Sequence, residues 1–163
     1  MRFKIPFMRG EASEKSKVPF KKGDAQDQWA IPLTKILIVD DDEVILKTVK
    51  RKLEDVGYRV ATANDGAEAI SVVRMEKPDL ILLDITFPPD VAGIPWDGFR
   101  LMEWLNHVNG WKKTPIIIIT GDQEVKQKER ALAGGAVAFF HKPISHDDLI
   151  KVIHTTLTSS SST

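Results

Sequence analysis

The stretch KILIVDDD, residues 35–42, joins an apolar run of strand length to three consecutive aspartates. Four more apolar runs follow along the chain: YRVATA (58–63), DLILL (79–83), PIIIIT (115–120) and AVAFF (136–140). Runs that are apolar almost throughout indicate strands buried on both faces, as in a parallel sheet that helices cover on each side. We therefore predict five buried strands.

Amphipathic stretches between these runs predict helices. The apolar positions after the first run and after the last run recur at helical spacing: Ile45, Val49, Leu53 and Val56, then Leu149, Ile153 and Leu157. Gly57 is suited to end the first helix, and Gly66 and Gly98 lie at or near helix starts. Because connections between parallel strands are right-handed, the alternation predicts an α/β fold, a doubly wound five-stranded parallel sheet of order 2-1-3-4-5.

The composition is that of one soluble domain. Of 163 residues, 42% are hydrophobic and 28% charged, and no apolar run reaches the roughly 20 residues that a transmembrane segment needs. The absence of cysteine excludes disulfides and thiolate zinc sites, and the cytoplasm is the expected compartment. Residues 35–163 carry sixteen Lys/Arg against nineteen Asp/Glu, so we expect no direct contact with nucleic acid.

The two ends of the chain differ from this middle part. Residues 1–33 mix basic, polar and Gly/Pro positions without a sustained period, which predicts a flexible basic N-terminal extension. The alternative is a docking arm, because the apolar residues Phe3, Ile5, Phe7 and Met8 stand among basic neighbours. Residues 158–163 form a Ser/Thr-rich tail that we expect to be disordered, which leaves 34–157 as the folded domain.

Polar residues suited to phosphate chemistry follow four of the predicted strands. The first strand runs into Asp40–Asp42, the third into Asp84 and the fourth into Thr120, and the fifth precedes Lys142. Parallel sheets of this kind bind ligands beyond the carboxyl ends of their strands, so these side chains should converge at one edge. Clustered carboxylates require cations, and a hard divalent ion such as Mg²⁺ with a nearby ammonium meets that need. An aspartate there can act as a covalent nucleophile toward phosphorus.

Each of these residues also has an ordinary structural interpretation. Asp41 or Asp42 can cap the first helix, and Thr120 or Asp122 the fourth. Asp84 can be a turn residue, and Lys142 a solvated one. These interpretations do not explain why all of them fall at the same ends of alternating strands.

The ordered set of motifs resembles the receiver domain of two-component response regulators over about residues 34–157, and so implies a flavodoxin-like receiver fold. The motifs that carry the resemblance are ILIVDDDE, GYRVATANDGAEAI, PDLILLDITFP, PIIIITGD and GGAVAFFHKP. By this resemblance, Asp84 is the phosphoacceptor, Asp41 a direct Mg²⁺ ligand and Asp40 an acidic partner that reaches the ion through water. The backbone carbonyl of Thr86 is the remaining protein ligand.

The resemblance also implies roles for residues on the last two strands. Thr120 matches the switch hydroxyl, and Lys142 matches the lysine that pairs with the phosphoryl group. Phe139 matches the aromatic switch position, where it lacks the hydroxyl of a tyrosine. The bond between Lys142 and Pro143 matches a cis peptide bond, which is accessible before proline.

The implied function is a phospho-accepting signalling domain rather than a conventional enzyme. The resemblance implies a Mg²⁺-dependent transfer of a phosphoryl group from a sensor histidine kinase or histidine phosphotransfer protein to Asp84. The output is then a change in binding to a separate downstream effector protein, since only about six residues follow the last helix. A phosphorylation-dependent homodimer is a further form that such an output takes.

One departure from the family pattern lies beside the predicted site. Pro88 and Gly98 are ten residues apart, where the family has about four between the matching positions, so the loop TFPPDVAGIPWDG carries an insertion. We expect either a partly ordered flap anchored by Trp96 or a solvated or partner-docking loop.

Two other functions compete with phospho-acceptance. One is a pseudo-receiver that binds partners without taking phosphate. The other is a haloacid-dehalogenase-type phosphatase, because Asp40–Val44 also fits that family's D-x-D-x-[TV] pattern. The phosphatase needs a further acidic pair at a strand end, whereas Asp147 and Asp148 fall in a predicted helix, and it leaves Asp84 unexplained.

Overall fold

A computed structural model describes residues 34–86, 97–107, 113–121 and 125–160. The proposed N-terminal extension, most of the insertion with Trp96, and residues 161–163 lie outside the described residues. Strands and helices alternate along the chain: β1 Lys35–Val39, α2 Glu43–Asp55, β2 Arg59–Ala63, α3 Gly66–Glu76, β3 Leu80–Leu83, α4 Gly98–His107, β4 Ile116–Thr120, α5 Val125–Ala133, β5 Ala138–His141 and α6 His146–Ser160.

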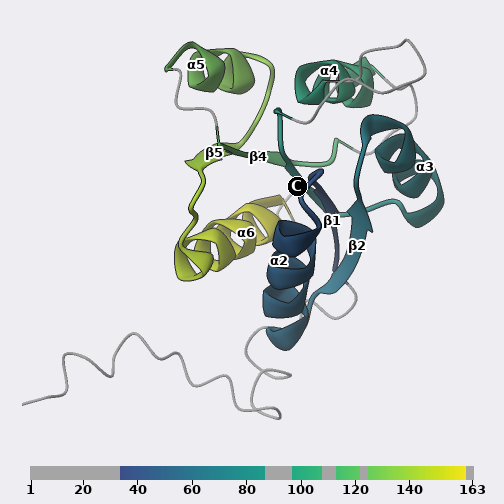
Figure 1. The fold of residues 1–163 in the computed structure, drawn as a ribbon, viewed down its shortest axis with the longest axis vertical. Helices are drawn as coiled ribbons and strands as arrows, with labels where there is room; N and C mark the ends of the chain where they lie inside the picture. Colours follow the sequence, from purple (N-terminus) through teal and green to yellow (C-terminus); the bar gives the residue numbers. More distant parts are fainter. Residues whose placement is uncertain (1–33, 87–96, 108–112, 122–124, 161–163) are drawn as a thin grey trace, which may run out of the picture. The chain divides into compact units, whose positions relative to one another are not determined.

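The five strands form one parallel sheet in the order β2-β1-β3-β4-β5, as predicted. Helices α2 and α6 cover one face of the sheet, and α3, α4 and α5 cover the other (Figure 1). Every residue of β3 and of β4 is buried. Both faces of the central strands therefore carry a core, which explains why their sequences are apolar throughout rather than alternating.

The first helix follows from its cap and its apolar stripe. The Asp42 side chain accepts hydrogen bonds from the backbone N–H groups of Val44 at 2.8 Å and Ile45 at 3.3 Å, so the capping interpretation is correct for this aspartate. Gly57, with φ +102°, terminates the helix in a conformation that disfavours other residues. The buried positions are Leu46, Val49 and Leu53. The helix thus turns Leu46 rather than the predicted Ile45 fully into the core.

Two boundaries differ from the sequence-based expectation. Strand β5 begins at Ala138, because Ala136 still lies in the turn that closes α5, where its N–H donates to the Ala131 carbonyl at 3.0 Å. Helix α6 runs to Ser160, beyond the boundary expected at residue 157. In its last turn, hydroxyls bond to backbone carbonyls of the preceding turn: Thr158 Oγ1 to His154 O at 2.9 Å and Ser159 Oγ to Thr155 O at 2.8 Å.

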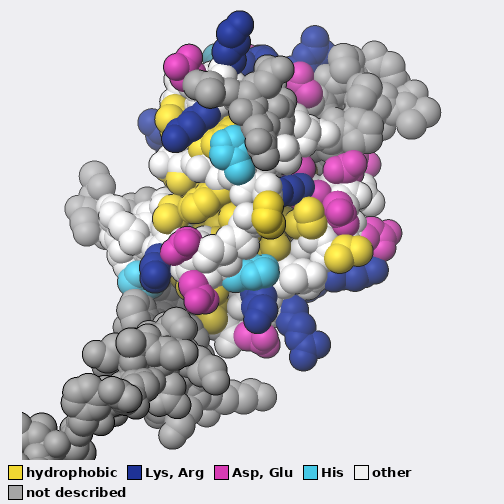
Figure 2. Space-filling model, turned by 60° about the vertical axis from the view of Figure 1, so that its left-hand side comes forward, with side chains coloured by type: hydrophobic (Ala, Val, Ile, Leu, Met, Phe, Trp, Pro, Cys, Tyr) yellow, Lys and Arg dark blue, Asp and Glu magenta, His cyan; other side chains and the backbone are white. Residues whose placement is uncertain are grey.

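The face that carries β5 and α6 shows apolar side chains at its surface between histidines and charged residues (Figure 2). Phe140, Ile144, Ile150 and Val152 from this part of the chain are partly buried against the core beneath α2 and α6. Among the described residues, no helix has both the length and the apolar character needed to span a bilayer.

Candidate functional site

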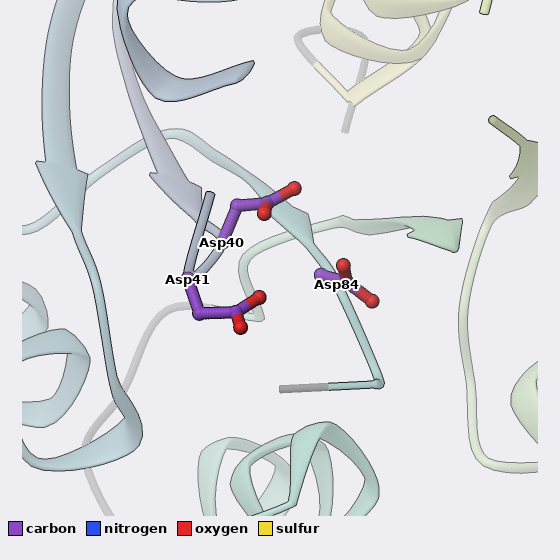
Figure 3. Close-up of side chains that lie close together, drawn as sticks. All are labelled: Asp40, Asp41 and Asp84. Atoms are coloured by element: carbon purple, nitrogen blue, oxygen red, sulfur yellow. The ribbon is translucent and has the colours of Figure 1, made fainter. Parts of the chain in front are cut away.

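Three carboxylates meet at the carboxyl ends of neighbouring strands. Asp40 and Asp41 follow β1, Asp84 follows β3, and ligand oxygens of all three lie within 4.8 Å of one another (Figure 3). The sheet fixes two of these residues through backbone bonds, from Asp40 N to Ala63 O at 3.1 Å and from Asp84 N to Val39 O at 2.9 Å. Asp40 and Asp84 are each only 3% exposed. The predicted convergence of strand-end carboxylates is therefore present in the fold.

A lysine from the connection between β5 and α6 enters the same cluster. Lys142 Nζ donates to Asp40 Oδ2 and to Asp84 Oδ2, each at 2.6 Å. Its position is set by a backbone bond from Lys142 N to Thr120 O at 2.8 Å, and by the cis bond between Lys142 and Pro143 that the sequence predicts. The Lys142 ammonium, which follows the edge strand β5, thus joins the ends of β1 and β3.

Burial and pairing act in opposite directions on the charges of this cluster. Burial raises the pKa of Asp40 above its usual value, although the bonds from Lys142 and from the Asp42 N–H oppose the rise. Burial alone would lower the pKa of Lys142, but its hydrogen bonds to Asp40 and Asp84 raise it overall. The lysine therefore stays protonated and supplies a positive charge that holds two buried carboxylates together.

The second oxygen of the Asp84 carboxylate is held by Thr86. Asp84 Oδ1 accepts from Thr86 N at 2.8 Å and from Thr86 Oγ1 at 2.7 Å. Thr120 Oγ1 donates in turn to Thr86 Oγ1 at 3.5 Å, and Thr120 is fully buried. The resemblance to receiver domains implies a role only for the backbone carbonyl of Thr86. The bond from the Thr86 hydroxyl to Asp84 was not predicted. Its only signal in the sequence is a threonine two residues after Asp84, which belongs to no spacing pattern.

The cluster suits a hard divalent cation. Its donors are carboxylate oxygens from Asp40, Asp41 and Asp84. Thr86 lies two residues beyond Asp84, just past the end of β3. Oxygen-only ligands of this kind favour Mg²⁺ over softer metals. Asp42 is not part of this group, since it caps α2. Asp147 and Asp148 lie exposed in the first turn of α6, so they do not complete the acidic strand end that a dehalogenase-type phosphatase requires.

Two further residues lie on elements next to the strands of this centre, Gly98 on α4 and Phe139 on β5. The start of α4 packs directly on the residues that follow β3, because a Cβ added to Gly98 would lie 2.5 Å from the Asp84 carbonyl oxygen and 2.6 Å from Ile85 Cα. Phe139 on β5 is half-buried, and its ring meets the His141 ring edge-on with centroids 5.1 Å apart. Gly98 thus fixes where the inserted loop must rejoin the fold.

Comparisons with known proteins agree with this geometry. Residues 36–154 match the family model of the response regulator receiver domain. The polar-differentiation response regulator DivK of Brucella anthropi is 32% identical over 118 residues, which are 72% of this chain and 91% of DivK. The cell cycle transcriptional regulator CtrA of Caulobacter vibrioides is 33% identical over 120 residues, or 74% of this chain. The match spans only 48% of CtrA, about half its length.

Solved structures give the same result. A CheY-like response regulator receiver domain protein from Methanospirillum hungatei JF-1 has a TM-score of 0.70 and 31% sequence identity, over 79% of this chain and 97% of that one. The family match begins in β1 and ends within α6, and so takes in the sheet and the strand ends where the carboxylates meet. This chain therefore belongs to the family of response regulator receiver domains.

Proposed function

We propose that this protein accepts a phosphoryl group on Asp84 in a Mg²⁺-dependent reaction, and that phosphorylation changes its binding to a partner protein. The observation that carries the proposal is the environment of the Asp84 carboxylate. This carboxylate is 3% exposed, contacts Lys142 Nζ at 2.6 Å and shares a cluster with Asp40 and Asp41. A buried carboxylate with an ammonium beside it and oxygen ligands around it has the groups that phosphoryl transfer requires.

The donor side of the reaction is a phosphohistidine on a sensor histidine kinase or a histidine phosphotransfer protein. A carboxylate oxygen of Asp84 attacks phosphorus, and a new P–O bond forms as the P–N bond of the donor breaks. The imidazole leaves with the electron pair of that bond and takes up a proton. The product is a mixed anhydride between the Asp84 carboxyl group and phosphate.

The residues around Asp84 divide the remaining tasks. Lys142 lies where it can donate to a phosphoryl oxygen, and the hydroxyls of Thr86 and Thr120 lie on the other side of the carboxylate. Bound Mg²⁺, held by Asp41, Asp84 and the Thr86 carbonyl with Asp40 close by, would neutralise charge on the carboxylates and the phosphoryl group. The positive charges of Lys142 and Mg²⁺ would offset the repulsion between the carboxylates and an anionic phosphodonor.

The output side involves Thr120 and Phe139. A phosphoryl group on Asp84 offers strong acceptors to the Thr120 hydroxyl, and Phe139 lies on β5, the edge strand that pairs with the strand of Thr120. We propose that movement of these two residues changes the β5 edge and thereby the binding of a separate effector protein or of a second copy of this chain. Any such shift is limited by how differently the phosphoryl group contacts the two states.

The test uses phosphoramidate as donor and the intact mass of the protein as readout. With Mg²⁺ present, the protein should gain the mass of one phosphoryl group, and chelation with EDTA or the change Asp84→Asn should abolish the gain. Asp42→Asn is the matched control, because asparagine is an equally good helix cap and Asp42 lies outside the cluster. A phosphoryl mass that persists in Asp84→Asn would refute the assignment.

A further inference from the structure

The side chain of Thr86 lies between two groups that the proposed function uses, the Asp84 carboxylate and the Thr120 hydroxyl. Its hydroxyl is 2.7 Å from Asp84 Oδ1 and 3.5 Å from the hydroxyl of Thr120. We propose that the Thr86 hydroxyl is a positioning group that orients the Asp84 carboxylate for phosphorylation and links it to Thr120. The inference deepens the proposed function, on which it rests.

The direction of this hydrogen-bond chain follows from proton counting. An ionised carboxylate only accepts, so the single proton of the Thr86 hydroxyl points at Asp84 Oδ1. Its oxygen is then left to accept, and it receives the bond from Thr120 Oγ1. Both hydroxyl dipoles therefore point toward the same carboxylate oxygen, and each strengthens the other.

The two oxygens of Asp84 are held from opposite sides. Lys142 Nζ binds Oδ2 at 2.6 Å, while Thr86 binds Oδ1 through both its N–H and its hydroxyl. With contacts at both oxygens, the plane of the carboxylate is fixed before any donor arrives. Such fixed orientation lowers the barrier to an attack that needs one geometry. Without the hydroxyl, the backbone N–H of Thr86 alone would hold Oδ1.

Phosphorylation changes what this chain of hydroxyls can bind. Once Asp84 becomes an acyl phosphate, its carboxylate charge is lost and the new phosphoryl oxygens are the stronger acceptors. The Thr86 hydroxyl then no longer has a charged partner at Oδ1, and the contact that it accepts from Thr120 loses its support. Release of Thr120 toward the phosphoryl group is therefore coupled to the state of Asp84 through the Thr86 side chain.

The test compares Thr86→Val, which keeps the shape and both backbone groups but removes the hydroxyl, with Thr86→Ser, which restores it. Initial rates of phosphorylation by phosphoramidate should be roughly three- to tenfold lower in Thr86→Val, and near wild type in Thr86→Ser. The Mg²⁺ concentration that gives half the maximal rate should be unchanged, because the hydroxyl is not the proposed ligand. Thr48→Val, at an exposed position on α2, is the control.

A double-mutant cycle with Thr120→Val tests the link itself. If the two hydroxyls act as one chain, the double variant should be no slower than the slower single variant, whereas independent roles would multiply the two losses. A wild-type rate in Thr86→Val, an equal loss in Thr86→Ser, or fully multiplied losses would each overturn the inference. Thr86→Ala serves in place of Thr86→Val if the melting temperature shows that valine disturbs the fold. Failure of the wild-type protein to take up phosphate would instead refute the proposed function.

Discussion

Two lysines contact carboxylates at opposite ends of the parallel strands, in different surroundings. These ends are here called the buried edge, beside Lys142, and the exposed edge, beside Lys35. Lys142 joins Asp40 and Asp84, which are 3% exposed, at the carboxyl end of β1. Lys35 begins β1 and pairs with the Glu76 carboxylate, with side-chain exposures of 24% and 45%. Its ammonium also donates to the Glu76 carbonyl at 3.1 Å, and its backbone N–H donates to Asp79 at 3.0 Å.

The two edges show what burial does to the same kind of pair. At the exposed edge, the hydrogen bond from Lys35 lowers the pKa of Glu76, so the pair favours the ionised acid. At the buried edge, desolvation raises the pKa of Asp40 even though Lys142 bonds to it. The fold therefore gains from its carboxylate at one edge and carries a cost at the other, which is the pattern expected where function rather than stability selects the residues.

Removing each lysine in turn should give the largest contrast between the edges. Lys142→Met should slow phosphorylation by phosphoramidate by about 100-fold or more, because it removes the ammonium that contacts the proposed acceptor carboxylate of Asp84. Lys35→Met should leave the rate within about twofold, since its contacts lie at the other edge of the sheet. Intact-mass time courses measure both. Similar losses in the two variants would mean that general stability, and not the site, controls the reaction.

Two glycines give a second, smaller contrast: Gly98, the first residue of α4, and Gly134, which packs against α4. An alanine at Gly98 would place its Cβ 2.5 Å from the Asp84 carbonyl oxygen, which is rigid backbone, whereas the nearest atom to a Cβ at Gly134 is the end of the flexible Met102 side chain. Gly98→Ala should therefore slow phosphorylation about tenfold and cost about 1–3 kcal/mol of folding stability.

Gly134→Ala is the control for that variant. It should alter stability less and leave the phosphorylation rate near wild type, because Gly134 lies after α5, against the part of α4 that bears Met102 and Asn106. Rates and urea unfolding curves of the two variants provide the comparison. A wild-type rate in Gly98→Ala would show that the acceptor strand tolerates displacement by α4.

The sequence predicted the fold and the convergence of the site because both depend on patterns that the chain repeats. Five apolar runs and the strand-end positions of Asp40, Asp84 and Lys142 determine which side chains meet once the sheet order is known, although the edge strands β2 and β5 are only partly buried. The two boundary differences lie at the ends of helices, where local hydrogen bonds close the turn after α5 and accompany the last turn of α6. Such bonds at Ala136 and Thr158 leave no periodic signal in the sequence.

The contact between the hydroxyls of Thr86 and Thr120 and the close packing of Gly98 could not be predicted for a related reason. Both depend on distances of a few ångströms between segments far apart in the chain, as with Thr120 and Thr86. A threonine or glycine is compatible with many loops, so its identity alone does not distinguish a site contact from an ordinary turn. Only the packed strand ends show which groups lie within hydrogen-bonding range.

The smallest expected effect is a difference in sign between two conservative substitutions, measured as urea unfolding at pH 7 with EDTA present. Asp40→Asn should stabilise the protein, because it removes a carboxylate that burial disfavours while Lys142 keeps its bond to Asp84. Glu76→Gln should destabilise it slightly, because it removes the exposed acid that Lys35 favours in its ionised form.

The pH dependence of these differences follows from the direction of each pKa shift. Because the pKa of Asp40 is raised on folding, the folded protein binds more protons than the unfolded chain between the usual value of 3.8 and the raised one. The cost of Asp40 is thus complete above the raised pKa and disappears as the pH falls below 3.8. Because the pKa of Glu76 is lowered, its benefit is complete above the usual value of 4.5 and is lost as the pH falls through the lowered one. The two variants should therefore deviate from wild type in opposite directions at pH 7 and approach it together in acid. Deviations of the same sign at pH 7 would mean that the contacts of Lys142 outweigh the burial of Asp40, and that the two edges do not differ in the way their exposures imply.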